Sequence, residues 1–132
     1  MIKGLNHVAI AVSNLDDALG VFVGQLGLKL EKTMVVEQQR VKAALLRAGE
    51  TKVELLEPTD KESGVAKFIE KKGEGIHHIA LSVSDIEGHL SDLKQKGLVL
   101  IDEKPRIGME GGRIAFIHPK STRNVLVELV EV

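Results

Sequence analysis

The chain has 132 residues, of which 43% are hydrophobic and 28% charged, and its formal net charge is −1 at pH 7. This is the composition of one ordinary globular domain. The near-neutral charge offers no general basic field to nucleic acid or an anionic membrane, and without Tyr or Trp the chain lacks most stacking platforms for single strands. Because cysteine is absent, thiolate ligands, disulfides and cysteine nucleophiles are excluded. With neither a membrane-length apolar run nor a signal pattern, we expect a cytoplasmic protein.

Residues 1–58 predict a β-α-β-β-β module. Residues 4–12 alternate as in a strand, and Asn14 is a suitable N-cap for a helix that continues to about Gln25. Gly27 is placed to end this helix. Three strands are then expected, over residues 28–37, 39–47 and 51–57.

Residues 59–75 connect this module to a second one over residues 76–132. The connection is expected to contain a short helix, Ser63 to Lys72. The second module opens on a strand and continues with a helix that Ser84 or Asp85 caps and Gly97 ends. Its remaining strands are expected over residues 98–103, 113–118 and 124–130.

The two modules repeat the same pattern. Leu5–Val12 (LNHVAIAV) returns as Ile76–Val83 (IHHIALSV), and Lys52–Glu57 (KVELLE) returns as Leu126–Glu131 (LVELVE). Each module therefore opens on a strand with a histidine and closes on a strand with a glutamate. Such self-similarity indicates a duplicated supersecondary unit.

The repeated histidines and glutamates form a candidate metal-ligand set. Side chains alternate across a strand, so His7 shares its face with Ala9 and Ala11, whose small size leaves room for another group. A carboxylate projecting from the middle of a sheet is costly unless it is paired or binds a metal. Two imidazoles and two carboxylates, from His7, Glu54, His78 and Glu128, suit a divalent cation that takes N and O ligands.

The fold class predicted from these elements is α+β. Each module is too small to stand alone, so the two are expected to pair and form one curved mixed sheet around a metal-containing cleft. The whole chain would then be a single domain built from module 1 (residues 1–58), the connecting helix (59–75) and module 2 (76–132).

The paired modules with His…Glu…His…Glu resemble the vicinal oxygen chelate (glyoxalase/bleomycin-resistance) superfamily over the whole chain. Within it, separate segments resemble the methylmalonyl-CoA epimerase family. They are VELLEP at 53–58, the run from SGVAKF at 63–68 to GEGIHHI at 73–79, and HPK at 118–120 followed by VLVEL at 125–129.

The resemblance implies a single-domain enzyme that inverts C2 of methylmalonyl-CoA. It assigns metal binding to His7, Glu54, His78 and Glu128, and proton transfer to Glu128. Cobalt, manganese, zinc or nickel would each suit such a site as a Lewis acid. Some related epimerases carry a second catalytic glutamate on the third strand of the first module, where this chain has Ala43, so the second base is not assigned.

The remaining expectations concern the substrate and the assembly. Four basic residues are candidate contacts of the acyl-CoA phosphates: Lys104, Arg106, Arg113 and Lys120. By analogy with the superfamily, a homodimer is expected. No nucleic acid or membrane partner is expected.

Other functions of the same superfamily stay open. Glyoxalase I uses the same four ligands on the methylglyoxal–glutathione hemithioacetal, but its Asp-Pro-Asp-Gly turn is missing from this sequence. A ring-opening dioxygenase would use two histidines and one carboxylate on iron. A drug-sequestering protein without metal would need an apolar pocket, for which the chain offers few aromatic residues.

Overall fold

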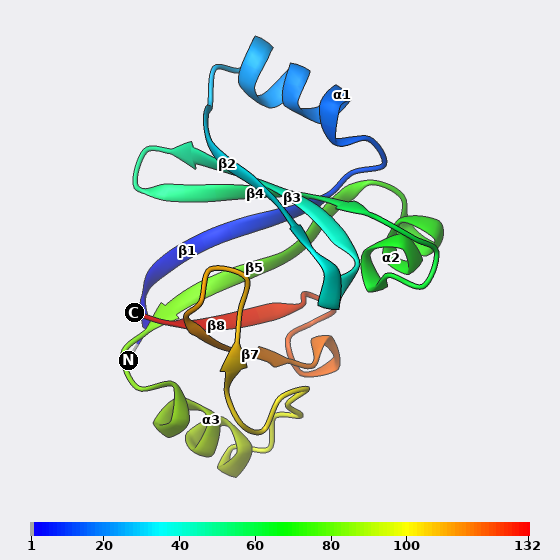
Figure 1. The fold of residues 1–132 in the computed structure, drawn as a ribbon. Helices are drawn as coiled ribbons and strands as arrows, with labels where there is room; N and C mark the ends of the chain where they lie inside the picture. Colours follow the sequence, from blue (N-terminus) through cyan, green and yellow to red (C-terminus); the bar gives the residue numbers. More distant parts are fainter. Residues whose placement is uncertain (1) are drawn as a thin grey trace. The chain divides into compact units, whose positions relative to one another are not determined.

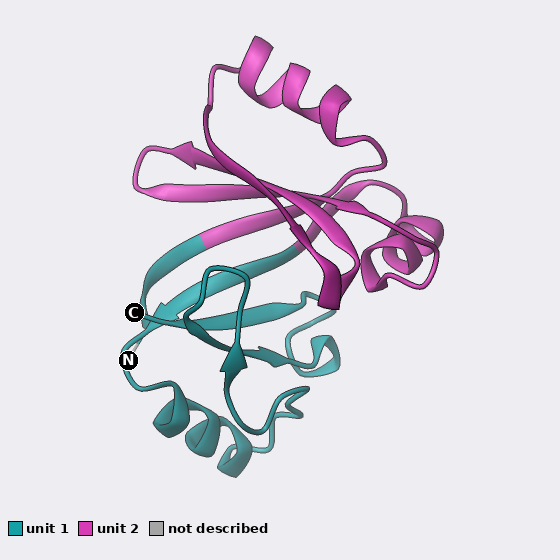
Figure 2. Ribbon diagram, in the orientation of Figure 1, with its two compact units in different colours: residues 1–6, 78–132 teal, residues 7–77 magenta. Residues whose placement is uncertain are grey.

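The computed structural model describes residues 2–132; Met1, with which the first predicted module begins, lies outside the described residues. Its strands follow the hydrogen-bonded order β2-β3-β4-β1-β5-β8-β7-β6 and mix parallel with antiparallel pairs (Figure 1). The predicted α+β class is therefore confirmed. The chain divides into two compact units, one of residues His7–His77 and one of the chain up to Asn6 together with His78–Val132 (Figure 2).

The unit of residues 7–77 contains the second half of β1 and the elements from α1 to α2. Its strands are β1 (Ile2–Ala11), β2 (Lys29–Val36), β3 (Val41–Ala48) and β4 (Thr51–Pro58). Its helices are α1 (Leu15–Leu19), the π-helix η1 (Gly20–Gln25), the 3-10 turn η2 (Glu37–Gln39) and α2 (Gly64–Lys72). β1 pairs with β4 in parallel, whereas β3 runs antiparallel to both β2 and β4.

Local signals explain where the first helix begins and ends. The side chain of Asn14 accepts a hydrogen bond from the backbone N–H of Asp17 at 2.9 Å, as expected for an N-cap. The helix widens before it ends, since the N–H of Leu26 bonds to the carbonyl of Val21 at 2.8 Å. Gly27 then takes a φ of 86°, which glycine adopts without strain.

The second unit repeats this arrangement. Its strands are β5 (Gly75–Val83), β6 (Arg106–Ile107), β7 (Arg113–Ile117) and β8 (Val127–Glu131), and its helices are α3 (Ile86–Gln95) and the 3-10 turn η3 (Pro119–Ser121). β5 pairs with β8 in parallel, as β1 does with β4. The N-cap of α3 is Asp85, whose side chain accepts from the N–H of Gly88 at 3.1 Å.

Each unit buries its own apolar core between a helix and one face of its strands. In the unit of residues 7–77, Leu15 of α1 packs with Leu46 and Leu55 of the sheet. In the other unit, Ile86 and Leu90 of α3 pack with a cluster that includes Leu129. The large branched side chains of the strands thus face the helices. None of the helices within residues 2–132 is long and apolar enough to cross a membrane.

The prediction of a strand over residues 98–103 is wrong. In this segment the only ladder contact in the described chain is a single bridge between Leu100 and Ile117, and the short strand β6 lies further on, at Arg106–Ile107. The side chain of Asp102 explains the change, because its Oδ2 accepts the backbone N–H of Phe116 at 2.9 Å. A carboxylate therefore takes the place of a ladder carbonyl, and Pro105 has no N–H with which to continue a ladder.

Candidate metal site

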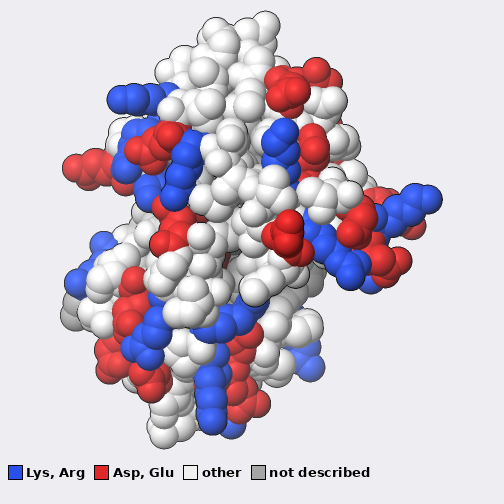
Figure 3. Space-filling model, in the orientation of Figure 1, with Lys and Arg blue, Asp and Glu red and all other residues white. Residues whose placement is uncertain are grey.

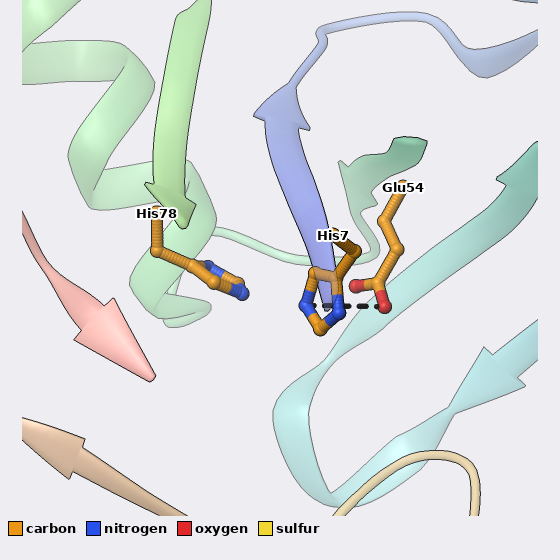
Figure 4. Close-up of side chains that lie close together, drawn as sticks. All are labelled: His7, Glu54 and His78. Atoms are coloured by element: carbon orange, nitrogen blue, oxygen red, sulfur yellow. Dashed lines mark ion pairs between the residues drawn. The ribbon is translucent and has the colours of Figure 1, made fainter. Parts of the chain in front are cut away.

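In the unit of residues 7–77, a histidine and a glutamate from neighbouring strands form a buried pair. The register of β1 and β4 places Ala9 beside Glu54, so His7 lies two residues earlier on the same face. Nε2 of His7 lies 3.3 Å from Oε2 of Glu54 (Figure 4). His7 is 4% exposed and Glu54 is 2% exposed, so both polar groups are withdrawn from water at a place where only pairing or ligation offsets the cost.

The second unit contains the same pair. The register of β5 and β8 places Ala80 beside Glu128, with His78 two residues earlier. Nε2 of His78 lies 2.9 Å from Oε1 of Glu128, and each residue is 6% exposed. The duplication seen in the sequence therefore reproduces the geometry of the pair, including the alanine that is the register partner of the glutamate.

The donor atoms of each pair suit a transition-metal ion. Imidazole nitrogen and carboxylate oxygen bind such ions at about 2.1 Å, which puts two ligands at right angles about 3 Å apart. The two observed N–O separations, 3.3 and 2.9 Å, match that spacing. His7 and Glu54 in one unit, and His78 in the other, each offer a buried ligand atom.

Ala43, the position that the family resemblance compares with a second catalytic glutamate, lies on β3. It pairs with Leu56, and Leu45 pairs with Glu54, so Ala43 shares the face of Glu54. Its exposure is 0%. The methyl group of alanine cannot exchange a proton with a substrate, so the second carboxylate that the family resemblance implies has no counterpart at this position. Glu37 and Glu50, the acidic residues nearest to Ala43 in the sequence, are both exposed and lie outside β3.

Two of the four basic residues predicted to contact substrate have partners within the chain. The guanidinium of Arg113 donates to Glu131 at 2.8 Å and to Glu87 at 2.7 Å, and these hydrogen bonds raise its pKa. Nε of Arg106 donates to Asp102 at 3.1 Å. Lys104 and Lys120 are exposed. On the face drawn in Figure 3, basic and acidic side chains are interspersed, and the substrate contacts of these four residues stay a prediction.

The sequence analysis missed a second function of the glutamate-bearing strands. Three residues after Glu54, Oε1 of Glu57 accepts the N–H of Leu15 at the start of α1, at 2.6 Å. In the other unit, Oε2 of Glu131 accepts the N–H of Ile86 at the start of α3, at 3.2 Å. Carboxylates are favourable at helix N-termini. The conspicuous repeat of Glu57 as Glu131 was the signal that could have revealed these contacts.

The His-Pro-Lys segment forms the start of a turn. Nδ1 of His118 accepts the N–H of Lys120 at 3.1 Å and caps the 3-10 turn η3, in which Pro119 is the first residue. Such a cap requires a side-chain acceptor followed by proline, whose missing N–H is not needed at a helix start.

Comparison with known proteins agrees with this fold. The sequence profile of the Glyoxalase/Bleomycin resistance protein/Dioxygenase superfamily matches residues 6–116. The chain therefore belongs to this superfamily.

Individual relatives narrow the comparison. The chain is 38% identical to the mitochondrial methylmalonyl-CoA epimerase of Homo sapiens, covering 95% of this chain and 72% of that protein. It is 39% identical to the ethylmalonyl-CoA/methylmalonyl-CoA epimerase of Cereibacter sphaeroides, covering 100% of both. Among solved structures, a variant of Streptomyces coelicolor methylmalonyl-CoA epimerase in complex with 2-nitronate-propionyl-CoA is 36% identical. Its TM-score is 0.93, and the match covers 99% of this chain and 95% of that one.

Proposed function

We propose that this protein is a metal-dependent isomerase that inverts C2 of methylmalonyl-CoA. The observation that carries the proposal is the buried His–Glu pair that occurs once in each unit with the same strand register. The epimerase relatives, aligned over nearly the whole chain, supply the substrate class. The acyl-CoA analogue bound by the Streptomyces coelicolor variant supports the same substrate class.

In this proposal His7, Glu54, His78 and Glu128 together bind one divalent cation, for which cobalt, manganese, zinc and nickel are candidates. Support comes from the N–O spacing in each pair and from the exclusion of water around all four side chains. The chemistry supplied by a bound cation is Lewis-acid stabilisation of the negative charge that develops on the thioester oxygen when C2 loses its proton.

Glu128 is the residue to which we assign proton transfer. Its carboxylate removes the C2 proton, and return of a proton to the opposite face inverts the centre. Glu128 is only 6% exposed, so few bulk water molecules can form hydrogen bonds with its carboxylate. We assign Glu54 ligation alone, and Ala43 excludes a second carboxylate at its position on β3.

The decisive experiment is proton exchange at C2 of methylmalonyl-CoA in deuterated water, run with metal-loaded protein beside an assay with the methylglyoxal–glutathione hemithioacetal. We expect exchange and epimerisation of the thioester and no turnover of the hemithioacetal. Turnover of the hemithioacetal alone would assign the protein to glyoxalase I. Binding of a drug without turnover of either substrate would indicate a sequestering protein.

The proposal also includes the phosphate contacts, the assembly and the location expected from the sequence. Lys104, Arg106, Arg113 and Lys120 are assigned to the CoA phosphates, with Arg113 the least available because two carboxylates already bind it. A cytoplasmic homodimer is expected. Light scattering and cell fractionation test these last two points directly.

A further inference from the structure

We propose that Phe116 limits the size of the substituent that the protein accepts at C2 of its substrate. This inference rests on the proposed epimerase function and adds a specificity-determining residue to it. The residues that support it all lie in the unit that contains His78–Val132.

Phe116 shares the face of the second His–Glu pair. In the antiparallel register of β7 and β8 it stands directly opposite Glu128, and directly opposed side chains project from the same face of a sheet. Its ring also meets the ring of His78 edge-on, with centroids 5.4 Å apart and an interplanar angle of 85°. The phenyl group therefore borders both members of the pair.

The ring does not belong to the helix-side core. Its neighbours Ala115 and Ile117 are buried in the cluster under α3, whereas Phe116 is half-buried. Ligand sites are lined mainly by apolar and aromatic side chains with a few convergent polar groups, and a half-buried ring beside a buried His–Glu pair fits that description. At the corresponding place in the other unit, Leu45 stands opposite Glu54 and is only 1% exposed. The two pairs thus differ in the side chain that borders the glutamate.

The position of the Phe116 ring is fixed by residues 101–106, which follow the bridge at Leu100. The N–H of Phe116 donates to Oδ2 of Asp102 at 2.9 Å, and its carbonyl accepts from Ile101 at 3.0 Å. The guanidinium of Arg106 lies over the ring, 5.4 Å from its centroid, and donates to Oδ1 of Asp102 at 3.1 Å. Asp102 therefore holds both the backbone of Phe116 and the cation that covers its ring.

A fixed phenyl group beside the residue that moves the C2 proton leaves limited room for what C2 carries. One added methylene in a closely fitting apolar pocket typically changes kcat/KM by about 10-fold to 200-fold. We therefore expect the protein to favour methylmalonyl-CoA over ethylmalonyl-CoA, and expect this preference to depend on the phenyl ring.

The test compares kcat/KM for methylmalonyl-CoA and ethylmalonyl-CoA in the metal-loaded wild type, Phe116→Ala and Phe116→Leu. We expect the ethyl-to-methyl ratio to rise at least about 10-fold in Phe116→Ala and by a smaller factor in Phe116→Leu. Metal content is measured in parallel, because loss of the contact with His78 must be separated from a change in selectivity.

Phe68→Ala is the matched control. Phe68 makes the same kind of edge-on contact with a histidine, His77, with centroids 5.0 Å apart, but on the helix α2. The Phe68→Ala variant should be less stable than the wild type and should keep the wild-type ethyl-to-methyl ratio of kcat/KM. Asp102→Asn tests whether Asp102 positions the ring, because this variant holds Arg106, which covers the ring, more weakly. It should raise the ethyl-to-methyl ratio of kcat/KM less than Phe116→Ala does and leave metal content unchanged.

The outcomes are distinguishable. A wild type that epimerises methylmalonyl-CoA, with an unchanged substrate ratio in metal-loaded Phe116→Ala and Phe116→Leu, overturns the inference and leaves the proposed function standing. A wild type that turns over neither thioester overturns both. A ratio that rises equally in Phe68→Ala would assign the effect to general loosening and also overturn the inference.

Discussion

The substitution Glu128→Gln separates proton transfer from metal binding. Glutamine keeps the size of the side chain and one oxygen donor, but it cannot accept a proton from C2. The Glu128 side chain is only 8% exposed and lies 2.9 Å from Nε2 of His78, so a nearly isosteric replacement can keep its place in the pair. Loss of a general base typically lowers turnover by about 10²–10⁴-fold, which corresponds to about 3–5 kcal/mol in the activation barrier.

Glu54→Gln is the matched control, because the first pair repeats the second. The Glu54 side chain is 3% exposed and lies 3.3 Å from Nε2 of His7, so both variants remove one buried carboxylate beside one histidine. If Glu54 is a ligand only, its variant should lose less turnover than Glu128→Gln at the same metal occupancy.

The assay measures epimerisation of methylmalonyl-CoA, metal content of the purified protein, and deuterium wash-in at C2 starting from each epimer. When one of two proton-transfer groups is removed, wash-in should be suppressed much more for one epimer than for the other. Equal, small losses in both variants, with no difference between the epimers, would refute the role assigned to Glu128.

Three further predictions concern the metal, pH and the core. His7→Ala and His78→Ala should each bind cobalt much more weakly, because each removes one ligand; unchanged metal content in both, by elemental analysis, would rule out the proposed site. Hydrogen bonds from Arg113 hold the pKa of Glu131 below its ordinary value of 4.5. The stabilisation from this pair should therefore be present above pH 4.5 and be lost as pH falls through the lowered pKa. Glu131→Gln should lower the free energy of unfolding by urea at pH 7, with a difference from wild type that shrinks in strong acid; a difference that grows in acid would contradict this. Leu46→Ala removes a side chain with 0% exposure from the α1 core and should cost about 2–5 kcal/mol in denaturant unfolding, whereas a loss below 1 kcal/mol would show that the cavity collapses.

Local pattern alone determined much of this protein. Strand alternation has a period of two, so the sequence directly shows that His7 and His78 face away from the branched residues that pack under the helices. The repeat of Glu54 as Glu128 identified the partner strands, and caps such as Asn14 act within a few residues of themselves. The α+β class and the candidate ligands could therefore be predicted before any contact was known.

The tertiary structure decided what depends on contacts between distant residues. Residues 98–103 have strand-like composition, but the carboxylate of Asp102 binds the backbone of Phe116 and ends the ladder there. Whether Glu57 and Glu131 are surface charges or helix anchors depends on which N–H group the fold brings to them. The contact of Phe116 with His78 likewise arises from strand pairing. Periodicity assigns a residue to a face of its own strand, whereas the neighbour it meets on that face is set by long-range packing.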